Sequence, residues 1–219
     1  MHWVDVSSGL AVPMRQVAAS GRFTPAELST MAVDVIDWER GGAEDIMKRT
    51  RKELGRDVFA DRYRPRFVIA DATTAVLRRP DLITSIEGIQ YIPDKLRALA
   101  SWYNQLADGG LLLVAAETRW PSWIRHESGS IVYSPPSILT TAARALQARG
   151  VRILAQGSRS FDDEDLLHDA NYVLLEKLAG TRLVLRDTLR RTWTNPYGYE
   201  ASYYGPRVSG ASLLKVTRP

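Results

Sequence analysis

Apolar positions along the chain switch repeatedly between short unbroken runs and helical spacing. Five compact apolar runs predict strands: HWVDV, MAVDVID, PRFVIAD, PDLITSI and LLLVAAE, which begin at residues 2, 31, 65, 80 and 111. VRILAQG (151–157) and NYVLLEKL (171–178) predict two more. LLLVAAE has no polar residue before Glu117, which is typical of a strand buried on both faces of a parallel sheet.

Segments with helical spacing separate these runs. The clearest covers residues 93–106, where apolar side chains recur at i, i+3 and i+4 (Leu96, Leu99, Ala100, Tyr103 and Leu106). Three more helices are predicted over 12–20, over 43–54, and from a cap at Ser134 to Gly150. The polar stretch GRFTPAELST (21–30) predicts a loop. Alternating strands and helices imply right-handed crossovers and a doubly wound α/β sheet.

The last 40 residues break this alternation. TWTNPYGYEASYYGPRVSG (192–210) is rich in Tyr, Gly and Pro, and SLLKV (212–216) predicts a closing strand. We therefore expect a Rossmann-like core over 1–180 and a loop-rich C-terminal extension over 181–219 that packs on it. Disordered segments are poor in aromatic residues, so Trp193 and some of the tyrosines are expected to line an acceptor pocket or a subunit contact. An extra hairpin on a remote sheet edge is the alternative.

Composition narrows the class of protein. The chain has 219 residues, a length that suits one generous domain, and a net charge of +4, a mild excess that is weak support for an anionic partner. It has no cysteine, which excludes disulfides, cysteine–zinc sites and a thiol nucleophile. No apolar stretch approaches the roughly 18–20 residues that span a bilayer, and the N-terminus lacks a signal-peptide pattern. These features predict a soluble, cytoplasmic protein with no membrane partner.

Acidic and small residues follow the ends of successive predicted strands. The segment 5–11, DVSSGLA, joins the first strand to the first helix, and Asp37, with Glu39 as the alternative, ends the second strand. Asp71-Ala72 ends the third, TSIEGIQY (84–91) covers the end of the fourth, and Gly109-Gly110 precedes the fifth. Ligands in open α/β sheets bind beyond the carboxyl ends of the strands, so these residues form one candidate site.

This order of elements and motifs resembles the class I S-adenosylmethionine-dependent methyltransferases over roughly residues 2–178. In that family an acid ends the first strand before a glycine-rich turn; here Gly9 is kept, and Ser7 and Ala11 replace the flanking glycines. The resemblance implies a mostly parallel, seven-stranded sheet, with S-adenosylmethionine as cofactor and S-adenosylhomocysteine as product. This cofactor has no phosphate and does not need the cradle of a full glycine fingerprint, and Ser7 and Ala11 are small enough to leave its pocket open.

The resemblance also implies a role for each strand-end residue. Asp5 and Gly9 would lie near the amino-acid part of the cofactor, Asp37 would accept both ribose hydroxyl protons, and Asp71 would accept from the adenine amino group beside Ala72. The full set of expected cofactor contacts is Asp5, Ser7, Gly9, Asp37, Trp38, Asp71, Ala72 and Ser85. Each acid also has a structural interpretation: Asp5 as a cap of the following turn, Asp37 as a solvated strand end, and Asp71 as an Asx-turn residue.

The candidate catalytic residues are Glu87 and Tyr91 after the fourth strand and His126 in the loop TRWPSWIRHESGS (118–130). Methyl transfer from a sulfonium is an in-line displacement, so positioning supplies much of the rate and a general base is optional. His126 is either a base or an ordinary loop residue. Trp120 and Trp123 form either an aromatic wall for a flat substrate or a pin that holds the loop. The three histidines do not sit at ligand spacing with acids, so no metal site is predicted.

Three functions fit these residues. The leading hypothesis is methyl transfer to an O or N atom of a small or medium-sized acceptor. The second is an RNA methyltransferase that uses the basic, aromatic tail, although the fourth-strand segment lacks the Asn/Asp-Pro-Pro-aromatic motif of enzymes that methylate base amino groups. The third is a non-catalytic methyltransferase-fold subunit that binds or scaffolds. Many family members carry N-terminal helices that cover the site, so here the extension, a homo-oligomer or a partner subunit is expected to cover it.

Overall fold

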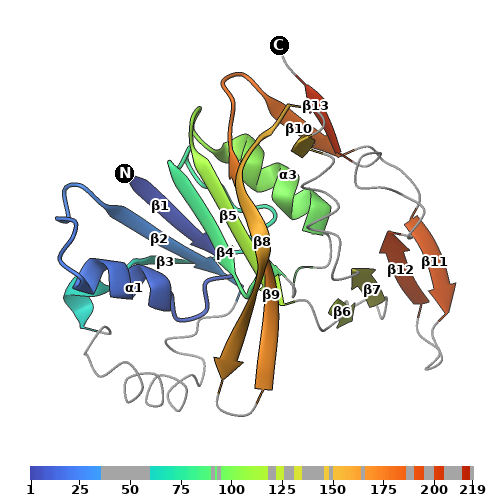
Figure 1. Ribbon diagram of the computed structural model, residues 1–219, viewed down its shortest axis with the longest axis horizontal. Helices are drawn as coiled ribbons and strands as arrows, with labels where there is room; N and C mark the ends of the chain where they lie inside the picture. The colour runs from blue at the N-terminus through green and yellow to red at the C-terminus, as the bar shows by residue number, and fades with distance from the viewer. Residues whose placement is uncertain are drawn as a thin grey trace.

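A seven-stranded sheet forms the centre of the computed structural model, which describes residues 1–35, 60–89, 92, 95–117, 122–125, 131–134, 146–147, 150–163, 166–185, 190–194, 200–204 and 214–217 (Figure 1). The strand order is β3-β2-β1-β4-β5-β9-β8. The first five strands pair in parallel, whereas β9 is antiparallel to both β5 and β8. The predicted mostly parallel, doubly wound sheet is confirmed. The bounds are β1 His2–Val6, β2 Ser29–Asp34, β3 Arg66–Ile69, β4 Leu82–Ile86, β5 Leu111–Glu117, β8 Arg152–Asp163 and β9 Leu166–Glu176.

Helices cover both faces of this sheet. Helix α1 (Val12–Ala19) follows β1, the 3-10 turn η1 (Asp61–Tyr63) precedes β3, and α3 (Lys95–Gln105) precedes β5. Trp3 packs in one apolar cluster with Met14 of α1, whereas its neighbour Val4 packs in another with Leu99 of α3. Adjacent strand residues point to opposite faces, so α1 and α3 lie on opposite sides of the sheet. Among the described residues, no helix is long and apolar enough to cross a membrane.

The hairpin β8–β9 is longer than the apolar runs predict and projects past the end of β5 (Figure 1). β9 pairs with β5 only from Leu111↔Glu176 to Glu117↔Ala170. The β8–β9 ladder continues beyond that point to Asp163↔Leu166. β5 itself buries Leu112 and Val114 fully but Leu111 and Leu113 only in part. The expected burial on both faces of β5 is therefore complete on one face only.

The described residues of the C-terminal extension include strands in addition to the predicted closing strand. β11 pairs with β12, β12 pairs in parallel with β7, and β7 pairs with β6, while β10 pairs with β13 in a second small sheet. β6 lies within residues 118–130, which were expected to be a loop, and Ser134 ends β7. A closing strand is confirmed at β13. The bounds are β6 Ser122–Arg125, β7 Ile131–Ser134, β10 Arg182–Leu185, β11 Arg190–Thr194, β12 Glu200–Tyr204 and β13 Leu214–Thr217.

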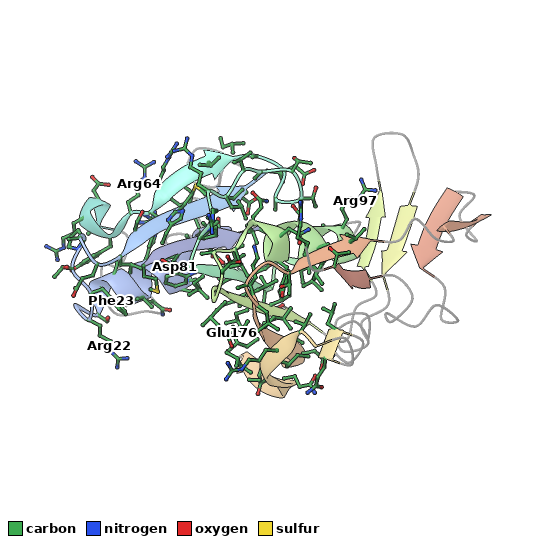
Figure 2. All side chains as sticks on the ribbon, turned by 90° about the horizontal axis from the view of Figure 1, so that it is seen from above. Arg22, Phe23, Arg64, Asp81, Arg97 and Glu176 are labelled. Carbon is green, nitrogen blue, oxygen red and sulfur yellow. The ribbon has the colours of Figure 1, made fainter. Side chains whose placement is uncertain are left out.

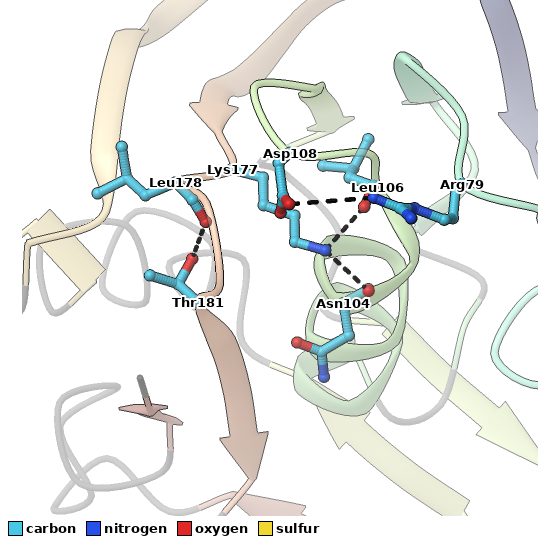
Figure 3. A network of polar contacts seen from close by, with 7 residues as sticks. All are labelled: Arg79, Asn104, Leu106, Asp108, Lys177, Leu178 and Thr181. Atoms are coloured by element: carbon cyan, nitrogen blue, oxygen red, sulfur yellow. Dashed lines mark hydrogen bonds and ion pairs between the residues drawn. The ribbon is translucent and has the colours of Figure 1, made fainter. Parts of the chain in front are cut away.

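The C-terminal end of α3 is held by buried polar contacts (Figure 3). Lys177 is 8% exposed, and its Nζ donates to the carbonyl oxygens of Asn104 at 3.0 Å and Leu106 at 2.7 Å. Burial lowers the pKa of the Lys177 ammonium. The Asn104 amide binds the backbone of Leu183 in β10 through two bonds of 2.8 and 2.7 Å. The cation therefore satisfies the last carbonyls of the helix, as a C-terminal cap does.

Candidate functional site

The turn between β1 and α1 contains three left-handed residues in alternating positions. Ser7, Gly9 and Ala11 have φ values of 55°, 54° and 52°. Only glycine adopts this conformation without a steric penalty, so Ser7 and Ala11 are strained. Ala11 is fully buried and packs with Trp3 and Met14, which compensates part of the strain. The turn therefore has the backbone of a three-glycine loop with only one glycine.

Gly9 is not required by any neighbouring protein atom. A Cβ built on Gly9 would meet nothing within 4 Å. Its N–H donates to Oδ2 of Asp34 at 2.9 Å, and the N–H of Ser8 donates to the carbonyl oxygen of Val33 at 3.2 Å. The left-handed φ of Gly9 by itself favours glycine, because a side chain at this φ is strained even where space is open.

The turn after β4 lies directly on Ser7. A Cβ on Gly88 would lie 2.5 Å from the Cβ of Ser7 and 2.7 Å from its carbonyl oxygen, so position 88 must lack a side chain. Glu87 beside it is exposed and also left-handed, with φ 55°. Its N–H donates to the carbonyl oxygen of Ala115 at the end of β5. These contacts bring the carboxyl ends of β1, β4 and β5 together, as the sequence predicts for Ser7, Ser85 and Glu87.

Asp5 is a buried carboxyl group held by a short chain of side-chain hydrogen bonds. It is 3% exposed, Thr84 Oγ1 donates to its Oδ1 at 2.6 Å, and Trp3 Nε1 donates to Thr84 Oγ1 at 2.9 Å. Burial raises the pKa of Asp5 to about 7, helped by the carboxylate of Asp34 and opposed by the Thr84 hydrogen bond. Asp34, rather than Asp5, binds an N–H of the turn.

The second strand ends earlier than the sequence predicts. β2 finishes at Asp34, and Val35 after it is 63% exposed. Asp34 is thus the described acid at this strand end, and sequence reasoning missed it. The apolar run in the sequence continues past Asp34, and the end of β2 is set by its pairing with β1, where Val6 lies opposite Val33. Asp37 and Trp38 lie outside the described residues, as do Tyr91 and His126.

Two buried hydroxyl groups at these strand ends have no hydrogen-bond partner in the described part of the chain. They are the Oγ atoms of Ser8 in the turn and of Ser85 in β4. Ser85 is fully buried, and its Oγ would lie 3.3 Å from a Cβ on Gly88. Buried side-chain polar atoms nearly always have a partner in folded proteins, so these two groups need an explanation.

Asp71 and Ala72 begin a tight turn after β3. The N–H and Oγ1 of Thr73 both donate to Asp71 Oδ1, at 2.8 and 2.7 Å, so Asp71 does form an Asx turn. Ala72 is buried. Ile69, the last residue of β3, is 61% exposed and with Val35 gives the carboxyl edge of the sheet an apolar surface.

A separate surface hollow of about 600 Å³ lies at the opposite end of β3. It is lined by Asp61, Arg64, Pro65, Arg66 and Phe67. Figure 2 shows Arg64 on the β3 side of the sheet, away from Glu176 of β9. Within the described ranges, no group of three or more His, Cys, Asp or Glu side chains could hold a metal ion.

Solved structures similar to this one establish its fold. The CurJ carbon methyltransferase matches with a TM-score of 0.50 at 9% identity, over 82% of this chain and 49% of that chain. The antibiotic-resistance methyltransferase Kmr matches with a TM-score of 0.54 at 13% identity, over 82% of this chain and 87% of that chain. The [4+2]-cyclase SpnF matches with a TM-score of 0.52 at 17% identity, over 82% of this chain and 75% of that chain. The chain thus spans about half of the CurJ chain. No protein-family model and no curated protein matches it. The chain has the class I methyltransferase fold.

Proposed function

We propose that this chain binds S-adenosylmethionine and transfers its methyl group to an O or N atom of a small or medium-sized acceptor. The observation that carries the proposal is the pair of buried hydroxyls, Ser8 Oγ and Ser85 Oγ, which lack a partner at the strand ends that also hold Asp5 and Gly9. A buried polar group without a partner costs about 1–3 kcal/mol. The amino-acid part of the cofactor carries a carboxylate and an ammonium, which are the partners that hydroxyl groups can bind.

Asp5 fits the ammonium group of the same part of the cofactor. A buried carboxylate without a cation is unfavourable, which is why the pKa of Asp5 is raised. A bound ammonium supplies the missing positive charge and stabilises the ionised form. Thr84 fixes one carboxylate oxygen of Asp5, so the side chain is oriented before the ligand arrives.

The surroundings of Gly9 support the same location for the amino-acid part of the cofactor. The left-handed φ of 54° favours glycine there, and a Cβ at this position would meet no protein atom within 4 Å, in contrast to Gly88. The open space beside Gly9 is room in which a ligand can approach the backbone closely. We place the amino-acid part of the cofactor against Ser7, Ser8 and Gly9.

The adenosine part is proposed to follow the carboxyl ends of β2 and β3. Asp34 or Asp37 accepts from the ribose hydroxyls, and Asp71 accepts from the adenine amino group beside Ala72. Val35 and Ile69 offer exposed apolar surface to the ring, and Trp38 is proposed to contribute as well. Each assignment uses an acceptor or an apolar surface where the ligand presents a donor or a flat face.

The cofactor, when bound, supplies a methyl group on a positively charged sulfur. The chain's part is to orient the acceptor in line with that bond and to exclude water. Where the acceptor loses a proton, the proposed bases are Glu87, which is exposed next to Gly88, together with Tyr91 and His126. In this transfer the methyl carbon would gain a bond to the acceptor atom and lose its bond to sulfur, which would keep the electron pair.

Calorimetric titration with S-adenosylhomocysteine tests the proposal, with Ser85→Ala as the diagnostic variant. Removing a buried, unpartnered hydroxyl should stabilise the free protein by about 1 kcal/mol and yet weaken ligand binding by roughly two- to tenfold. Ser20→Ala is the control, because Ser20 follows the far end of α1, where its hydroxyl donates to the carbonyl oxygen of Val17. Absence of binding by the wild-type protein would refute the proposal, and unchanged affinity in Ser85→Ala would remove its main support.

A second candidate, an RNA methyltransferase, is favoured by a row of arginines. Arg62, Arg64 and Arg66 are exposed at alternating positions leading into β3, and two of them line the surface hollow. The Arg62 guanidinium lies 4.7 Å from the Tyr63 ring centre, and that of Arg64 lies 5.8 Å from Phe67. Arginines beside aromatic rings are typical of surfaces that bind single-stranded nucleic acid.

Salt dependence distinguishes this candidate. The affinity for a single-stranded RNA should fall linearly with salt on logarithmic axes, and replacing all three arginines by alanine should reduce the slope by about 2. Arg22→Ala combined with Arg152→Ala is the control, because both residues lie away from the hollow. Equal slopes for wild type and triple variant would exclude this surface as the RNA site.

A further inference from the structure

We infer that Trp102 and Gln105 of α3 are positioning residues for the adenine end of the site. The inference rests on the proposed function, because it concerns the loop that begins with Asp71 and Ala72. Neither residue lies at a strand end, and neither is expected to touch the ligand.

Three hydrogen bonds attach this loop to α3. Trp102 is fully buried, and its Nε1 donates to the carbonyl oxygen of Ala72 at 2.7 Å. Gln105 Oε1 accepts from the N–H of Leu77 at 2.8 Å, and Gln105 Nε2 donates to the carbonyl oxygen of Ala75 at 3.0 Å. The main chain is thus held at both the beginning and the end of the loop.

Within the loop, the turn fixes the carboxylate of Asp71. Its Oδ1 accepts from both the N–H and the Oγ1 of Thr73, and its carbonyl oxygen accepts from the N–H groups of Thr74 and Ala75. In the described part of the chain, nothing donates a hydrogen bond to Asp71 Oδ2. The orientation of this carboxylate therefore depends on the turn, and the position of the turn depends on α3.

A fixed acceptor discriminates between purine rings. The exocyclic amino group of adenine can donate to Asp71, whereas hypoxanthine has an oxygen at that position and would leave two acceptors facing each other. A site built to bind an N–H rejects an analogue that lacks it, but only if the acceptor cannot move away. Loosening the loop should therefore reduce the preference for adenine more than the overall affinity.

α3 supplies its own matched control in Asn104. Its side chain makes two main-chain hydrogen bonds, as that of Gln105 does, but both are to Leu183 of β10. Asn104→Ala removes the same kind of contact from the same helix without touching the loop after β3. A loss of stability common to both variants can thus be separated from a loss of positioning.

The experiment measures, by calorimetry, the affinities for S-adenosylhomocysteine and S-inosylhomocysteine. We expect the wild-type protein to prefer the adenine ligand by about tenfold or more. Trp102→Phe and Gln105→Met should reduce that preference to roughly threefold or less, and Asn104→Ala should retain it. Thermal unfolding identifies which variants are folded at the assay temperature. If Trp102→Phe does not fold, Gln105→Met alone provides the test.

The outcomes separate this inference from the proposed function. Retention of the wild-type preference by both loop variants would overturn the inference, as would an equal loss in Asn104→Ala. A wild-type protein that binds both ligands equally would also overturn it and leave cofactor binding intact. A wild-type protein that binds neither would remove the proposed function and this inference together.

Discussion

Buried polar groups are hydrogen-bonded differently in two regions of the molecule. One region is the face between α3 and β10, and the other is formed by the strand ends of β1 and β4. Near β10, Asn104 makes two main-chain hydrogen bonds, Tyr103 pairs with Thr181, and Lys177 caps the helix. At the strand ends, Ser8 and Ser85 have hydroxyls without a described partner, and the pKa of Asp5 is raised by burial. This contrast supports the proposal that the ligand site lies at the strand ends.

Backbone strain does not separate the two regions. Ser7, Ala11 and Glu87 are left-handed at the strand ends, and Arg78 and Arg79 are left-handed before β4, each costing of order 1–2 kcal/mol. α3 is regular and packs buried aromatic side chains. The regular α3 region contributes stability, whereas each left-handed turn residue reduces it.

Gly9→Val should give the largest effect on binding. Its backbone would be strained by the left-handed φ, and its side chain would occupy the proposed ligand space, so the affinity for S-adenosylhomocysteine should fall more than about a hundredfold. Gly21→Val is the matched control, because Gly21 is also left-handed with open space around it but follows the far end of α1. Calorimetry measures the affinities, and thermal unfolding separates strain from loss of contact. Survival of binding in Gly9→Val would make the turn purely structural.

Alanine at Asp34 and at Asp37 should identify the ribose acceptor. Loss of a charge-assisted contact costs about 1.5–3 kcal/mol, roughly a tenfold to hundredfold loss of affinity. Asp34→Ala also removes the acceptor of the Gly9 N–H, so it should destabilise the free protein as well. Asp37→Ala tests the other candidate acceptor, which follows the end of β2 in the sequence. The affinities of the two variants are compared under identical conditions. If both leave the affinity unchanged, the ribose lies elsewhere.

Cofactor affinity should depend on pH through Asp5. Its folded pKa of about 7 lies above its value of 3.8 in an unfolded chain, so the folded state holds a proton that the unfolded state lacks between these values. The stability of the free protein should therefore fall as the pH rises from about 4 to about 7. Binding of the ammonium needs ionised Asp5, so affinity should rise over the upper part of this window, approaching tenfold per pH unit below the folded pKa, and level off above it.

Asp5→Asn should remove both pH dependences. Calorimetry between pH 5 and 8 measures affinity, and denaturant unfolding over the same range measures stability. A wild-type affinity that does not change with pH would show that the ligand's cation does not meet Asp5.

Asn104→Ala should have the smallest effect on binding and a clear effect on stability. It removes two partly buried hydrogen bonds to Leu183, at about 1 kcal/mol each. The unfolding free energy should fall by about 1–3 kcal/mol while the affinity for S-adenosylhomocysteine stays the same. A change in affinity comparable to that of Asp34→Ala would break the division between the two regions.

The sequence by itself determined the alternation of strands and helices and the presence of a doubly wound sheet. The period of apolar residues is a local property, set by which side chains face the core, so runs such as 111–117 and the spacing in 93–106 could be read directly. The positions of Asp5, Ser7, Gly9, Asp71 and Ser85 at strand ends followed from the same pattern, because parallel strands bring their carboxyl ends to one edge.

Only the tertiary structure decided what these residues contact. The end of β2 at Asp34 depends on pairing with β1, and the strands of the last 40 residues depend on partners such as β7, far away in the sequence. Gly88 contacts Ser7, about 80 positions away in the sequence, and Trp102 binds Ala72, about 30 positions away. Hydrogen bonds and steric contacts of this kind act over a few ångströms in space, and a local pattern contains no record of which distant residue will be there.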